Sequence, residues 1–148
     1  MAKTELSDSS RSAFPTSGAT AEATTWLRRF LALDSLVTTG NGLIYLVASG
    51  AVGRLLGVGS GLLLTIGILL TVFGAGVGYL GSRRRPAAPA VQAVIAVNGL
   101  WTVLSLVTVA FLLVDPSTVG LVWIPVQAAV VGGFAVLQFV TLRRTSRS

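Results

Sequence analysis

The chain has 148 residues, of which 53% are hydrophobic and only 11% are charged, and its mean hydropathy is +0.82. Soluble domains carry about 25% charged residues, so the composition excludes an ordinary soluble protein and predicts a membrane protein. Cysteine and histidine are absent and Met1 is the only methionine, which excludes thiol chemistry, the usual zinc sites and His- or Met-ligated haem. We therefore expect no metal and no cofactor. The net charge of +6 sits at the ends of apolar runs, which favours lipid over nucleic acid as the partner.

The first 25 residues are rich in Ser, Thr and Ala and show no repeating apolar positions, which predicts a disordered cytosolic tail over residues 1–25. Residues 26–144 form the predicted transmembrane domain, and residues 145–148 a short second tail. The domain contains four apolar runs, at about residues 30–52, 62–80, 91–114 and 119–142. Each run is long enough to cross about 30 Å of hydrocarbon as a helix, and none shows the alternation of a β-barrel strand. The predicted fold class is all-α, a polytopic membrane protein with a bundle of four transmembrane helices.

Basic residues gather at one end of these spans. They are Arg28, Arg29, Arg83, Arg84, Arg85, Arg143, Arg144 and Arg147. The opposite loops hold only Arg54 and Asp115. Because loops rich in arginine stay on the cytoplasmic side, we expect a multi-pass protein of the bacterial plasma membrane with both termini in the cytosol. The arginines are interpreted as topology determinants, with contact to anionic lipid head groups as the second interpretation.

The two halves of the chain resemble one another. Asn41-Gly42-Leu43-Ile44 in the first span and Asn98-Gly99-Leu100-Trp101 in the third occupy similar depths, and each is followed by a hairpin, a glycine-bearing span and an arginine cluster. Parallel two-helix repeats of this kind occur in transporters. The similarity fits a duplication of a two-helix unit and a chance resemblance equally well.

Asp34 is the one acidic residue within an apolar run. It begins a polar stripe whose three- and four-residue steps fall on one helical face, comprising Asp34, Thr38, Asn41, Tyr45 and Ser49. Intramembrane carboxylates often mark ion pathways, so one interpretation is a proton or cation site. The other, which the shallow depth of about 6 Å favours, is a structural ion pair with an arginine, namely Arg29, Arg84 or Arg143.

Asn41 and Asn98 lie deeper in their spans. We expect a hydrogen bond between them across the repeat axis. The alternative is a ligand site that adds three residues of the third span, Trp101, Thr102 and Ser105. Gln127 and Gln138, eleven residues apart, share a face of the fourth span and are expected to bond within the bundle.

Small residues form stripes on two spans and predict close helix packing. The stripe on the second span comprises Gly67, Thr71, Gly74, Gly78 and Ser82. The stripe on the fourth span comprises Ala128, Ala129, Gly132 and Gly133. We expect these stripes to pack the second and fourth spans together within one protomer, with packing between protomers as the alternative.

Arg29 followed by Asp34, together with the two Asn-Gly-Leu segments at Asn41 and Asn98, resembles small four-span integral membrane proteins of actinobacteria over residues 27–144. The resemblance implies a plasma-membrane location and no particular activity. A carboxylate in the first of four spans is also similar to small multidrug resistance transporters. Their Glu, aromatic motifs and shorter tails are not matched here, so none of their sites is carried over.

The membrane region holds a single carboxylate, whereas general acid–base catalysis needs paired groups, so we expect no enzyme. The leading expectation is a non-enzymatic protein that acts through self-association or as an accessory subunit of a larger membrane complex. The alternative is a small proton- or cation-coupled transporter or channel that uses Asp34.

Overall fold

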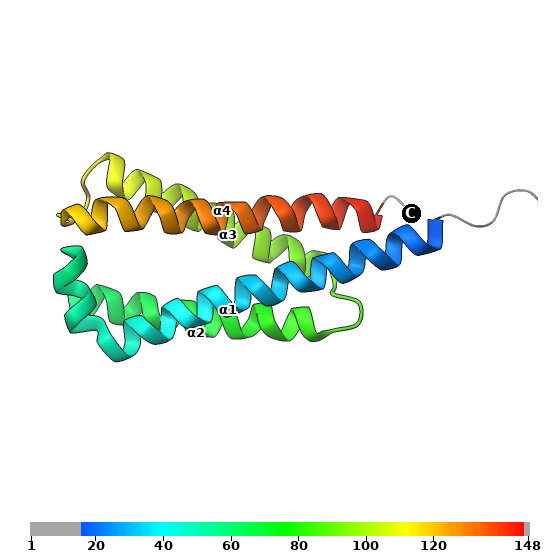
Figure 1. The fold of residues 1–148 in the computed structure, drawn as a ribbon, viewed down its shortest axis with the longest axis horizontal. Coiled ribbons are helices and arrows are strands. Elements are labelled where there is room, and N and C mark those ends of the chain that lie inside the picture. The colour runs from blue at the N-terminus through cyan, green and yellow to red at the C-terminus, as the bar shows by residue number, and fades with distance from the viewer. Residues whose placement is uncertain (1–15, 147–148) are drawn as a thin grey trace, which may run out of the picture.

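The computed structural model describes residues 16–146, which form helices and no strand (Figure 1). The helices are α1 (Thr16–Leu56), α2 (Ser60–Ser82), α3 (Ala88–Ala110) and α4 (Thr118–Ser146). All four are long and apolar enough to cross a membrane. The all-α bundle of four membrane-spanning helices predicted from the sequence is confirmed.

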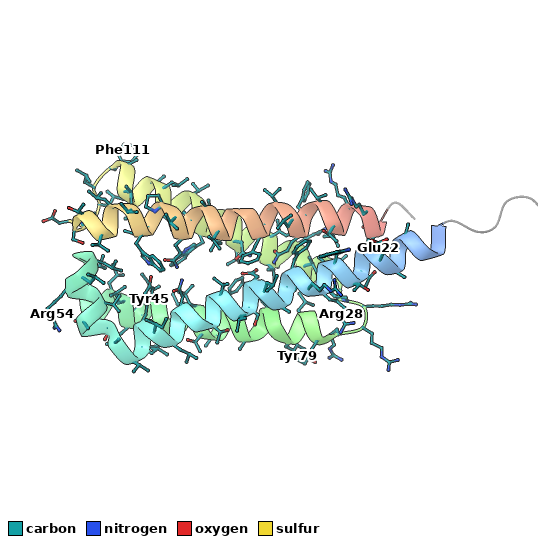
Figure 2. All side chains as sticks on the ribbon, viewed as in Figure 1. Glu22, Arg28, Tyr45, Arg54, Tyr79 and Phe111 are labelled. Atoms are coloured by element: carbon teal, nitrogen blue, oxygen red, sulfur yellow. The ribbon has the colours of Figure 1, made fainter. Side chains whose placement is uncertain are left out.

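Helix α1 joins the bundle together. It packs against α2 on one side and α4 on the other, α3 pairs with α4, and α2 and α3 touch only slightly. The first and last described residues lie at one end of the bundle, together with the loop over residues 83–87 (Figure 1). We call this the arginine end, because Arg28 lies there with the arginines of that loop, and Figure 2 shows Arg54 and Phe111 at the opposite end.

Helix α1 begins well before the predicted membrane span. The prediction of a disordered tail over residues 1–25 is wrong for its last part, because residues 16–25 are helical; residues 1–15 lie outside the described residues. Alanine and glutamate are good helix formers, and the buried side chains of Ala23 and Leu27 tie this segment to the bundle. With 41 residues, α1 is about 60 Å long, about twice the hydrocarbon thickness. Its first part therefore extends beyond the other helices at the arginine end.

A kink turns α1 across the opposite end of the bundle. Ala48 has non-helical dihedral angles (φ −121°, ψ 23°), and the segment beyond it runs toward α4 (Figure 1). Gly57 ends the helix in the left-handed conformation (φ +70°), where glycine carries no steric penalty. The Ser117 N–H donates to the Leu56 carbonyl at 2.9 Å and its hydroxyl donates to the Leu55 carbonyl at 2.5 Å. The loop before α4 thereby caps α1.

The third helix is shorter than predicted. It ends at Ala110 rather than near residue 114, because the chain turns at Leu112, whose φ is +48°. The loop over residues 111–117 is correspondingly longer than residues 115–118, which separate the third and fourth predicted spans.

Glycines bring α1 and α2 into close contact. A Cβ atom added at Gly42 would lie 2.7 Å from the Thr71 amide nitrogen and 2.9 Å from the Gly67 carbonyl oxygen. A Cβ at Gly74 would lie 2.8 Å from the Thr39 amide nitrogen. These atoms belong to backbone that cannot yield without separating the helices, so only glycine allows this approach.

The small residues of α2 therefore face α1, and the predicted packing of α2 against α4 is wrong. Gly78 meets Ser35 of α1, whose hydroxyl donates to the Gly74 carbonyl at 2.7 Å. On α4, a Cβ at Gly132 would lie 3.2 Å from Thr102 of α3, whereas a Cβ at Gly133 would meet nothing within 4 Å. The order of the helices in the chain explains why α2 packs against α1 and not against α4, since a short connection makes α1 and α2 antiparallel neighbours.

Candidate functional site

The Asp34 carboxylate is fully buried and accepts hydrogen bonds from side chains of three helices. The Asn98 Nδ2 of α3 and the Gln138 Nε2 of α4 each donate to Oδ2 at 2.7 Å. The Thr38 hydroxyl of α1 donates to Oδ1 at 3.1 Å. We call these four residues the Asp34 cluster.

The expected ion pair between Asp34 and an arginine is wrong, because the partners of the carboxylate in residues 16–146 are neutral. The Arg29 guanidinium lies 4.9 Å from the centre of the Trp26 ring. The Arg143 guanidinium lies 4.5 Å from the centre of the Phe139 ring. Both arginines stack on aromatic rings of their own helices, where the charge remains near the membrane surface.

An apolar layer separates the Asp34 cluster from the arginine end. It consists of six side chains that are at most 7% exposed, Leu27, Leu31, Val77, Val91, Val94 and Leu142. Leu31 lies one helical turn before Asp34, and Leu142 lies one turn after Gln138, so the layer is adjacent to the cluster on that side. We call these six residues the apolar layer. It explains why a carboxylate only about 9 Å along α1 from Arg28 makes no contact with the arginines.

A central cavity of about 290 Å³ lies on the other side of the cluster. Thr38 and Asn98 line it as well as contacting the carboxylate, so one layer of polar side chains separates Asp34 from the cavity. Asn41 and Gln127 add two more amides to its wall. A water molecule occupies about 30 Å³ in the liquid, so the volume matches about ten waters or one small solute.

The cavity opens sideways. Leu69 of α2 and Val97 of α3 belong to its wall, and their side chains are 59% and 44% exposed. These two helices touch only slightly, so the opening lies between them. In a bilayer that side faces the lipid chains.

Tyr45 continues the polar face of α1 beyond the cavity. Its hydroxyl donates to the Gln127 Oε1 at 3.1 Å and accepts from the Trp123 Nε1 at 3.0 Å. Tyr45 is eleven residues from Asp34, about 16 Å along α1. The predicted stripe therefore forms one polar face from Asp34 to Tyr45, and Ser49 is separated from it by the kink at Ala48.

The expected hydrogen bond between Asn41 and Asn98 is wrong. Asn98 donates to Asp34 instead, and Asn41 lines the cavity and makes no hydrogen bond among the described residues. A carboxylate is a stronger acceptor than an amide oxygen, and Asn98 therefore donates to Asp34 rather than to Asn41.

The third span contributes part of its predicted face. Trp101 lines the cavity, and the Thr102 hydroxyl donates to the Asn98 carbonyl at 2.8 Å. Ser105 does not line the cavity. The predicted bonding of Gln127 and Gln138 within the bundle is confirmed, since both bond to α1.

The two glutamines are the members of the site that sequence reasoning did not assign to it. Their eleven-residue spacing places them on one face of α4, and Asp34 and Tyr45 of α1 have the same eleven-residue spacing. This match of spacings on antiparallel helices was the available signal for the pairs Asp34–Gln138 and Tyr45–Gln127.

No family model, curated protein or solved structure matches this chain. The resemblance to small four-span proteins of actinobacteria stays a prediction. The contacts of the chain itself are thus the basis for any proposal about its function.

Proposed function

We propose that this chain is a proton-translocating membrane protein in which Asp34 takes up and releases a proton through the central cavity. The observation that carries the proposal is a fully buried carboxylate, held by three neutral donors and bordered by a cavity. Burying a charge without a countercharge is costly, and intramembrane carboxylates without an ion partner commonly belong to ion pathways. A purely structural role is better served by an apolar side chain or an ion pair.

The donors around Asp34 favour a proton over a metal cation. Hard cations require several oxygen ligands, whereas Asn98, Gln138 and Thr38 all direct hydrogens toward the carboxylate. The described residues also contain no group of three or more acidic, His or Cys side chains that could hold a metal.

The Gln138 side chain supports reversible protonation. Its Oε1 is buried and has no hydrogen-bond partner among the described residues. If Asp34 binds a proton, a half-turn of the amide brings Oε1 to accept the carboxyl O–H. The carboxylate and the carboxylic acid therefore both find a hydrogen-bond partner in Gln138.

The position of the apolar layer defines the remaining step. Asp34 is adjacent to the cavity and closed off from the arginine end by Leu27, Leu31 and their neighbours. A second buried cluster, Tyr45, Leu63 and Leu70, lies between the cavity and the opposite end of the bundle. Translocation then requires the side chains of both clusters to part, and the weak contact between α2 and α3 offers the least resistance. We further propose a non-enzymatic role in the bacterial plasma membrane with the arginine end in the cytosol, which the position of the arginines supports.

Proton flux into proteoliposomes that contain a trapped pH-sensitive dye tests this proposal. Under an applied pH gradient and a clamped membrane potential, we expect Asp34→Asn to lower the flux above empty vesicles at least tenfold. Asp115→Asn makes the same change at the opposite end and is expected to stay within twofold of wild type. Equal flux in the wild type and Asp34→Asn would contradict the proposal.

Self-association is the second candidate, and an exposed small-residue pair on α4 favours it. Ala129 and Gly133 are exposed one turn apart, and a Cβ at Gly133 meets nothing within 4 Å. Such pairs allow close contact between helices in lipid. If the chain is instead an accessory subunit of a larger membrane complex, the same face of α4 would contact the partner.

Counting subunits per particle in nanodiscs distinguishes this candidate. We expect an oligomer of the wild type that Gly133→Leu weakens at least fivefold. Gly76→Leu, at an exposed α2 glycine that also meets nothing within 4 Å, should leave it intact. A wild type that is strictly monomeric at high protein-to-lipid ratio would exclude self-association.

A further inference from the structure

A second hollow, of about 760 Å³, lies at the arginine end and is separate from the Asp34 cluster. The projecting first part of α1, the loop over residues 83–87 and the end of α4 form its walls. Its polar lining comprises Arg28, Arg84, Arg85, Thr20, Thr24, Thr25 and Thr145. Three arginines thus line one concave surface.

The hollow has the charge of an anion site. Among the described residues no acidic side chain lines it, and Glu22, on the projecting part of α1, is not part of its wall. The Arg28 Nε donates to the Gly81 carbonyl at 3.1 Å, which fixes this side chain across the gap between α1 and α2. Guanidinium groups match the geometry of phosphate with two parallel hydrogen bonds, so phosphate is the anion that the hollow fits best.

The threonines indicate what the phosphate carries. The hydroxyls of Thr24, Thr25 and Thr145 donate to carbonyls of their own helices, at 2.9, 3.0 and 2.7 Å. Their oxygen atoms are left as acceptors. They suit a group that bears hydroxyl donors next to the phosphate.

The hollow spans the head-group layer and extends beyond it. Thr20 lines the part of the hollow farthest from the membrane and is eight residues before Arg28, about 12 Å along α1. The polar layer on each side of a bilayer is about 5–8 Å thick, and the buried Leu27 lines the hollow at its apolar side. A lipid phosphate at the level of Arg28 would therefore place its head group along the threonine wall.

We infer that this hollow binds the phosphate of an anionic, hydroxyl-bearing phospholipid, a site that goes beyond the proposed proton pathway and does not depend on it. The chemistry of phosphatidylglycerol meets each requirement: an anionic phosphodiester for the arginines and hydroxyl donors for the threonines. A free phosphorylated polyol shares this chemistry and is the other source of the same ligand group.

Lipid binding to the full chain in neutral detergent, measured by native mass spectrometry, tests the inference. We expect short-chain phosphatidylglycerol to bind at least tenfold more tightly than phosphatidylcholine of the same chain length. Arg84→Gln with Arg85→Gln should weaken phosphatidylglycerol binding about thirtyfold, since each direct charge-assisted contact with the phosphate is expected to contribute about a factor of five. Arg83→Gln with Arg143→Gln removes the same charge from the same end, outside the hollow, and should stay within threefold of wild type.

The double variant Arg84→Lys, Arg85→Lys keeps the positive charges that set the orientation of the protein in the membrane. It removes the guanidinium groups that bind phosphate with two parallel hydrogen bonds, so we expect phosphatidylglycerol binding to weaken at least threefold in this variant as well. Glycerol phosphate separates the two sources: weak or no binding supports the lipid, and binding as tight as that of the lipid supports a free phosphorylated solute in the same site. Equal weakening by the two glutamine pairs, or equal binding of the two lipids, would overturn the inference.

Discussion

Asn98→Leu is expected to lower the free energy of unfolding by about 2–3 kcal/mol. The Asn98 Nδ2 lies 2.7 Å from the Asp34 carboxylate, and a hydrogen bond to a charged group is worth about 1.5–3 kcal/mol. Leucine has a similar volume, so the loss of the donor is the main change. Reversible unfolding by dodecyl sulfate in mixed micelles measures the effect.

Asn41→Leu is the matched control. Asn41 lines the same cavity but makes no hydrogen bond among the described residues, so we expect a change below about 0.5 kcal/mol, the usual range for a residue without a specific interaction. Equal losses in the two variants would show that the Asp34 cluster contributes nothing specific to stability.

Gly42→Ala is expected to lower the free energy of unfolding by about 2–3 kcal/mol. The added methyl group would lie within 3 Å of the Thr71 nitrogen and the Gly67 oxygen. Overpacking of a well-packed contact costs about 1–3 kcal/mol, and the upper part of that range applies because both neighbours are backbone atoms. The same unfolding measurement applies.

Gly40→Ala, two residues earlier on α1, has the opposite expectation. A Cβ at Gly40 meets nothing within 4 Å, and alanine is favoured over glycine in a helix by about 1 kcal/mol. We therefore expect unchanged or slightly higher stability. A loss in Gly40→Ala as large as in Gly42→Ala would contradict the described contact between α1 and α2.

The four spans and the common end of the arginines were predictable because each depends on residues close together in the sequence. Apolar runs such as residues 62–80 specify a helix in lipid by length and composition alone. The helical start of α1 was not predictable in this way, because residues 16–25 lack an apolar stripe. Their helix depends on the burial of Ala23 and on continuity with the span that follows.

The Asp34 site was predictable in its residues and not in its contacts. The stripe through Asp34, Thr38 and Tyr45 follows from helical spacing, whereas the partners Asn98 and Gln138 lie 64 and 104 residues away in the chain. Which amide reaches the carboxylate depends on the rotation of α3 and α4 about their axes. Helical periodicity leaves that rotation open for spans that are apolar on nearly every face.

The bundle contains two distinct polar regions. The Asp34 cluster and the cavity form an interior lined by neutral polar and apolar side chains, where we propose that Asp34 exchanges a proton. The arginine end forms a charged surface at head-group level. The apolar layer lies between these two regions.

The most direct test of the central claim is the titration of Asp34 itself. Solid-state NMR of the aspartate carboxyl carbons in lipid bilayers, with Asp34→Asn for assignment, follows this one group as the pH changes. A proton carrier requires the Asp34 signal to move reversibly between the positions of the acid and the carboxylate within the pH range in which the bundle stays folded. A signal that stays at one of the two positions over that whole range would contradict proton exchange at Asp34.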